Sequence, residues 1–223
     1  MSTRLWRALT AYYSKAPGTL VYLFTLTVTT WTLAGTDRAT DHKLMVSAST
    51  NLHNMTRDPI RVLVASAFWN DSDGFPWVTF AEFLILMAAA ERWLGTGRWL
   101  LAFIAGHVGA TLVTVTGIAW ALDRHLLPHR LAGTVDVGTS YGFFAVAAVF
   151  TYRFRSRRWR LIWAAGLAGY LIFTAWRRET FTDYGHLTAM LIGFAAYPLT
   201  RRRATTPEVQ SGARPSSETI LSS

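Results

Sequence analysis

The sequence predicts an all-α membrane protein with six transmembrane helices. The chain of 223 residues is 51% hydrophobic yet carries a formal net charge of +9, so its charged residues must be segregated from its apolar ones. Apolar stretches long enough to cross a hydrocarbon core of about 30 Å recur along the chain. They occupy residues 19–35, 75–90, 100–122, 135–152, 161–176 and 184–199. We expect these segments to pack as one polytopic bundle.

Proline and glycine mark where the first helices begin. A short basic lead, residues 1–17, ends at Pro17-Gly18, which opens the first helix. Pro76 precedes the second helix. The run Gly-Thr-Gly at residues 95–97 separates the second helix from the third. This turn is short, so these two helices must be antiparallel neighbours.

The predicted membrane domain covers residues 18–200, includes one long loop and is followed by a polar tail. The loop 36–74 is the longest and is partly apolar, so we expect it to fold against the outer surface of the membrane. It ends near an Asn-Asp-Ser glycosylation sequon at Asn70. Residues 201–223 are polar, rich in Ser and Thr and without periodicity, which is typical of a disordered tail.

The distribution of basic residues predicts the orientation in the membrane. Cytoplasmic loops collect Lys and Arg. If the N-terminus is inside, the cytoplasmic segments 1–17, 91–99, 153–160 and 201–223 carry most of the 22 basic residues, whereas the outer segments mix both signs. We therefore predict a multi-pass protein of the cell membrane with both termini in the cytoplasm. The excess of Arg over Lys suggests a GC-rich bacterial genome.

Several classes of function are disfavoured by composition. The arginines border apolar segments and form no basic face on a soluble module, which argues against nucleic-acid binding. The chain has no Cys, which excludes disulfides, iron–sulfur clusters and thiol chemistry. Its six His residues show no metal-ligand spacing such as His-Glu-x-x-His. We expect neither a metal nor a cofactor.

Ser140 and His186 are the residues best suited to chemistry. Each lies near the start of a predicted helix that begins on the outer face, so at about 1.5 Å per residue both lie within about 10 Å of the outer boundary. A histidine at this depth could take the proton of a serine nucleophile. Alternatively, Gly138-x-x-x-Gly142 is a pattern that lets transmembrane helices pack closely, and His186 could cap its helix or bond a neighbouring one.

Four other polar residues fall within predicted spans or directly before one. Glu82 and His107 lie in the middle of the second and third helices, where they could pair or line a polar cavity. Asp136 and Asp183 lie one turn before the serine and the histidine. Carboxylates favour helix N-termini, so we expect both to cap helices rather than to orient catalytic groups.

Three runs of sequence resemble the rhomboid family of intramembrane serine proteases. They are residues 91–99, from Glu91 onward, then Gly138-Thr139-Ser140, and then Gly185-His186-x-x-Ala189-x-x-x-Gly193. The resemblance spans about residues 18–200 and includes the six-helix topology. It implies that Ser140 is the nucleophile and His186 its general base, and that Glu91 is a structural glutamate. Glycines 138, 142 and 193 match the motif positions, and the implied partners are transmembrane protein substrates in the lipid bilayer.

The chain departs from the family pattern at several positions. The helix-two His-x-x-x-Asn pair that holds the oxyanion in the family falls on Phe75 and Thr79, and Tyr141 follows the serine where the family has Gly. Ala189 replaces a motif glycine, and the loop 36–74 lacks the Trp-Arg pair. The Thr79 hydroxyl and the backbone amides near Ser140 are candidate replacements.

Two functions therefore remain open at this stage. The first is an intramembrane endopeptidase that cleaves transmembrane substrates near the outer face. The second is an inactive rhomboid-like protein that binds transmembrane clients. A transporter fits less well, because the sequence shows no inverted repeat and no pair of helix-breaking prolines at midplane.

Overall fold

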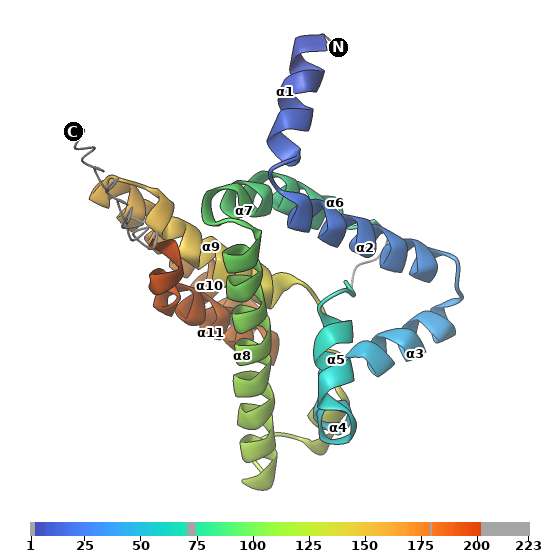
Figure 1. The fold of residues 1–223 in the computed structure, drawn as a ribbon. Coiled ribbons are helices and arrows are strands. Elements are labelled where there is room, and N and C mark those ends of the chain that lie inside the picture. The colour runs from blue at the N-terminus through green and yellow to red at the C-terminus, as the bar shows by residue number, and fades with distance from the viewer. Residues whose placement is uncertain (1–2, 71–74, 179, 202–223) are drawn as a thin grey trace, which may run out of the picture.

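Three helices form the centre of an all-helical fold. The computed structural model describes residues 3–70, 75–178 and 180–201, and every regular element in these ranges is a helix. The most extensive contacts join α8 (Thr96–Asp123), α9 (Ser140–Phe150) and α11 (Phe181–Ala195). Helix α10 (Arg157–Arg178) packs against α11 (Figure 1). The site residues on α9 and α11 therefore rest on the most tightly connected part of the molecule.

Glycines allow these three helices to approach closely. A Cβ at Gly193 of α11 would collide with the backbone carbonyl of Ala145 on α9, and one at Gly106 of α8 would collide with the Ala145 side chain. A Cβ at Gly142 would overlap the ring of Phe103. Small residues at helix contacts are the usual means of close packing in membranes. Gly193 therefore lets α11 contact the backbone of α9, and Gly142 leaves room for the Phe103 ring of α8.

The second predicted span is one helix interrupted by a wider turn. It comprises α6 (Trp77–Glu82), a π-helical segment η1 (Phe83–Met87) and α7 (Ala88–Leu94). Together with α2 (Pro17–Ala34) it closes an aromatic core, in which the Tyr22 and Phe83 rings stack with centroids 5.0 Å apart. This core joins the N-terminal helices to α8 and α9.

Glu91 holds three helix ends together. Its carboxylate is fully buried on α7 and accepts hydrogen bonds from the Gly18 backbone N–H (2.8 Å) and the Thr19 backbone N–H (2.7 Å). The hydroxyls of Thr19 and Thr96 also donate to it, each at 2.7 Å. The first N–H groups of a helix have no acceptor within that helix. Glu91 thus caps α2 from a distant segment and fixes the turn between α7 and α8.

The lead and the long loop contain more regular structure than the sequence indicated. Helix α1 (Thr3–Tyr13) occupies the basic lead and projects from the rest of the protein (Figure 1). The loop 36–74 contains α3 (Arg38–Ala48), α4 (Leu52–Arg57) and α5 (Pro59–Ser66), on the other side of α8 from α10 and α11. Short η2 (His129–Gly133), η3 (Thr151–Arg153) and η4 (Tyr197–Thr200) segments complete the described elements. The predicted disordered tail lies outside the described residues, apart from residue 201.

The expected start of the fourth helix at residue 135 is wrong. Helix α9 begins at Ser140, because the residues before it are hydrogen-bonded to other segments instead. The Asp136 carbonyl accepts from the Thr50 N–H, and the Gly138 N–H donates to the Ser66 carbonyl, each at 2.9 Å. Gly138 has φ +131°, a conformation that side chains other than hydrogen disfavour. This turn presents Ser140 at the tip of α9.

One of the described helices is long and apolar enough to span a membrane on length and composition alone, namely α8. Six membrane spans therefore remain a proposal.

Candidate active site

Ser140 and His186 meet although they are 46 residues apart in sequence. Ser140 is the first residue of α9, and His186 lies in the second turn of α11. The Ser140 Oγ is 2.9 Å from the His186 Nε2, a normal distance for a hydrogen bond. When Nε2 is unprotonated, the serine hydroxyl can donate to it. This is the arrangement in which an imidazole can act as general base toward a serine.

Two aromatic rings hold the imidazole of His186 in place. The Tyr141 ring packs edge-on against it with centroids 5.4 Å apart, and the Phe144 ring does so at 4.8 Å. Both rings come from α9, the helix that carries Ser140. The serine and the surfaces that position its partner are therefore parts of one rigid element.

Asp183 caps α11, as predicted. It forms a capping box with Thr180, whose hydroxyl donates to the Asp183 carboxylate at 2.6 Å. The same carboxylate lies 4.0 Å from the His186 Nδ1, which is beyond hydrogen-bond distance. Asp183 therefore acts on the histidine through its charge and not through a direct hydrogen bond.

The prediction that Asp136 caps α9 is wrong. The N-cap of α9 is Thr139, which makes no side-chain capping bond. The buried Asp136 carboxylate instead accepts hydrogen bonds from the Tyr141 hydroxyl and the Thr50 hydroxyl, both at 3.2 Å, and from Thr182 at 3.5 Å. It thereby ties the segment before Ser140 to α11 and to the α3–α4 turn.

A cavity of about 250 Å³ opens beside the Ser140–His186 pair. Thr79, predicted above as a candidate oxyanion donor, lines it. Phe75 does not: its ring packs on Trp77 and Phe80, with centroids 4.4 and 4.6 Å away. The walls are otherwise built from α6, the start of α9, α10 and α11. The cavity is lined by Asn70, Val78, Thr79, Glu82, Thr139, Ser140, Phe143, Phe144, Tyr170, Thr174, Arg178, Asp183 and His186.

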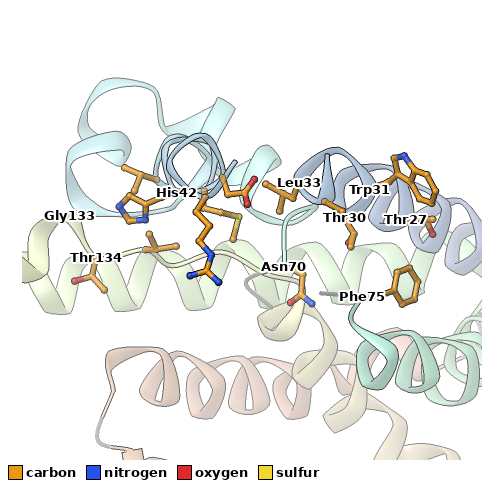
Figure 2. A pocket seen from close by; sticks show the side chains of 15 residues that line it. Thr27, Thr30, Trp31, Leu33, His42, Asn70, Phe75, Gly133 and Thr134 are labelled. Carbon is orange, nitrogen blue, oxygen red and sulfur yellow. The ribbon is translucent and has the colours of Figure 1, made fainter. Parts of the chain in front are cut away.

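Asn70 lines this cavity and was missed as a site residue by sequence reasoning. A larger cavity of about 1320 Å³, between the end of α2, α3 and residues 133–135, has Asn70 and Phe75 on its wall (Figure 2). The two cavities therefore adjoin at Asn70. In the sequence Asn70 stands out only as part of a glycosylation sequon, because nothing local indicates that its loop passes Ser140.

Glu82 and His107 do not form a pair with each other. The His107 Nε2 lies 3.0 Å from the Leu63 carbonyl and 3.2 Å from the Ser66 hydroxyl, so His107 joins α8 to α5. Ser66 and His107 are a second serine–histidine contact, but both are buried and the adjacent cavity has essentially no free volume. This contact is suited to packing, not to binding a substrate.

The comparisons with known proteins identify the family of this chain. The family model for rhomboid-like proteins matches residues 11–206. The chain belongs to the rhomboid-like family. The match covers α2 to α11, and so both helices that carry the serine–histidine contact of this rhomboid-like protein. Comparisons with curated proteins and with solved structures gave no match.

No group of three His, Asp or Glu side chains in the described part of this rhomboid-like chain is placed to hold a metal ion.

Proposed function

We propose that this protein is an intramembrane serine endopeptidase that cleaves transmembrane substrates near the outer membrane face. The observation that carries the proposal is the 2.9 Å contact between the Ser140 Oγ and the His186 Nε2 on the wall of a cavity. The other serine–histidine contact, Ser66 with His107, has no such cavity.

In the proposed reaction the Ser140 oxygen attacks a peptide carbonyl while its proton passes to the His186 Nε2. His186 then gives the proton to the departing amine, which leaves an acyl-enzyme ester on Ser140. A water molecule that loses its proton to His186 releases the acid product and restores the serine. The Tyr141 and Phe144 rings keep the imidazole aligned through both steps.

The oxyanion formed on the carbonyl needs hydrogen-bond donors. Ser140 is the first residue of α9, so its backbone N–H has no acceptor within the helix. The Thr79 hydroxyl and the Asn70 carboxamide line the same cavity and are further donors. One such donor contributes about 2.7–4 kcal/mol to transition-state stabilisation, so the loss of the family's usual pair requires substitutes of this kind.

The ends of the bundle support the proposed orientation in the membrane. Arg92, Arg153 and Arg155 line one depression at the end of α9 that is distant from Ser140. The length of α9 separates that end from Ser140 by about 15 Å at 1.5 Å per residue. Because basic residues favour the cytoplasmic side, the Ser140 end faces outward. In this proposal the apolar surfaces of α2 and α10, including exposed Phe24, Trp31 and Phe173, face lipid.

The test combines labelling of the nucleophile with cleavage. Wild-type protein in detergent or lipid is expected to react with a fluorophosphonate at Ser140, and Ser140→Ala to lose the label. Single-span model substrates should be cut by wild type, and rates should fall at least about 10³-fold in Ser140→Ala and in His186→Ala. Ser66→Ala is the matched control at the other serine–histidine contact and should keep both label and cleavage. Cleavage that survives both Ser140→Ala and His186→Ala would contradict the proposal.

A second candidate function rests on Phe75. At the family's histidine position this ring packs among aromatic side chains of α6, so one usual oxyanion donor is absent. A rhomboid-like protein without catalysis would bind transmembrane clients. Clients that co-purify equally with wild type and Ser140→Ala, without cleavage fragments or fluorophosphonate labelling, would favour this alternative.

A further inference from the structure

The cavity beside Ser140 contains a carboxylate that the proposed reaction does not use. Glu82 is the last residue of α6 and lines the cavity together with Val78 and Thr79. These three positions are spaced i, i+1 and i+4, so they share one face of the helix. Glu82 lies about 4.5 Å along the helix beyond Thr79, that is, about one turn deeper than the candidate oxyanion donor.

Glu82 differs from the buried carboxylates of the protein. Glu91, Asp136 and Asp183 each accept hydrogen bonds from neighbouring side chains or backbone. Glu82 has no hydrogen bond and no ion pair within residues 3–70, 75–178 and 180–201. A carboxylate on a membrane-embedded helix is costly, and such a residue marks a functional site by default.

The backbone changes directly after Glu82. The π-helical segment η1 begins at the next residue, Phe83, and ends at Met87. Such wider turns are frequent at functional sites, because the extra residue rotates one part of a helix relative to the next. Here the change lets Phe83 and Met87 face the core while Glu82 faces the cavity.

The other charged residues of the cavity leave Glu82 without a counter-ion. Arg178, at the end of α10, lines the cavity but forms no ion pair with Glu82. Asp183 is engaged with Thr180. The remaining wall mixes uncharged polar side chains and the His186 imidazole with the apolar or aromatic side chains of Val78, Phe143, Phe144 and Tyr170.

We propose that Glu82 selects substrates that carry a lysine or arginine side chain next to the scissile bond. The inference rests on the proposed peptidase function of the Ser140 site. A long basic side chain can pass along the apolar wall and reach the carboxylate about one turn below the reacting carbonyl. An acidic side chain at that position meets a like charge. Selection therefore arises from both attraction and repulsion.

The test uses three single-span substrates that differ only at one position beside the cleavage site, carrying Lys, Gln or Glu. That position is found by scanning Lys along the outer end of the substrate span and measuring binding to Ser140→Ala, which does not depend on cleavage. With full-length protein in lipid vesicles, we expect kcat/KM to fall in the order Lys, Gln, Glu, with at least about a tenfold span. Glu82→Gln should remove the order, and Glu82→Lys should reverse it. Arg178→Gln is the control at the other end-of-helix charge in the cavity lining and should keep Lys ahead of Glu.

Binding of the same substrates to Ser140→Ala separates this inference from the peptidase proposal. If wild type cleaves nothing, but Ser140→Ala binds the Lys substrate more tightly than the Glu substrate and the added Glu82→Gln change removes the difference, the inference stands and peptidase activity fails. Equal cleavage and binding of all three substrates would overturn the inference. A Lys preference that persists in both Glu82 variants, with unfolding temperatures like wild type, would also overturn it.

Discussion

Replacing Glu91 by Gln tests how a single carboxylate stabilises the fold. The change keeps the shape of the side chain but replaces one oxygen by an NH₂ group. The Gly18 N–H points to Oε1 and the Thr19 N–H points to Oε2. Either orientation of the amide therefore places an NH₂ group against a backbone donor, which cannot turn away. The hydroxyls of Thr19 and Thr96 can rotate and do not remove this conflict.

The expected loss of stability follows from these four contacts. A buried N–H without an acceptor costs about 1–3 kcal/mol, and the remaining bonds lose the strength that a charged acceptor gives them. We expect Glu91→Gln to lower the free energy of unfolding by about 3–5 kcal/mol. This is a large part of the total stability of a typical protein, about 5–15 kcal/mol.

The measurement is reversible unfolding in mixed micelles, followed by tryptophan fluorescence. Thr96→Val is the matched control, because it removes one donor and leaves Glu91 three others. It should cost about 1–2 kcal/mol. If Glu91→Gln costs no more than Thr96→Val, the carboxylate does not hold the ends of α2, α7 and α8 as the contacts indicate.

Two further substitutions test the helix contacts around Ser140. Gly193→Ala should lower the free energy of unfolding by about 1–3 kcal/mol, because the added Cβ meets the Ala145 carbonyl. Gly169→Ala is the control, because a Cβ there meets open space, and it should not lower the free energy of unfolding. Equal effects of the two substitutions would refute the close approach at Gly193. Tyr141→Phe should reduce stability by about 1–2 kcal/mol by removing the bond to Asp136, while the ring still packs on His186. Fluorophosphonate labelling of Ser140 should then continue at nearly the wild-type rate, and a loss of labelling would assign the hydroxyl a further role.

Much of the fold could be predicted because its signals are local. Helices were expected where α2, α6–α7, α8, α9, α10 and α11 lie, since runs of apolar residues and the glycine and proline punctuation are read directly along the chain. The start of α9 was predicted incorrectly because the residues before Ser140 bond to Thr50 and Ser66, partners that no local pattern reveals. The helices in the loop 36–74 have short or weakly periodic patterns, and the sequence therefore indicated only a partly apolar loop.

The same division applies to the candidate site. Ser140, His186 and Glu91 stand out in the sequence because each lies in a motif and because polar groups in apolar segments are rare. Asn70 and the cavity-facing position of Glu82 do not, since both depend on which segments pass Ser140 in space. The capping of α11 by Asp183 was predictable from its position, whereas the role of Asp136 depends on Tyr141 and Thr182.

The sequence by itself determined that this chain is helical, that it belongs with the rhomboid-like proteins, and which serine and histidine are the best candidates for chemistry. Composition, spacing and motif are sufficient for these conclusions because they concern residue types and not positions in space. Only the tertiary structure decided that the Ser140 Oγ lies 2.9 Å from the His186 Nε2, and that Asn70, Thr79 and Glu82 share their cavity. The reason is that helix packing, through contacts such as Gly193 with Ala145, sets these distances between segments that are remote in sequence.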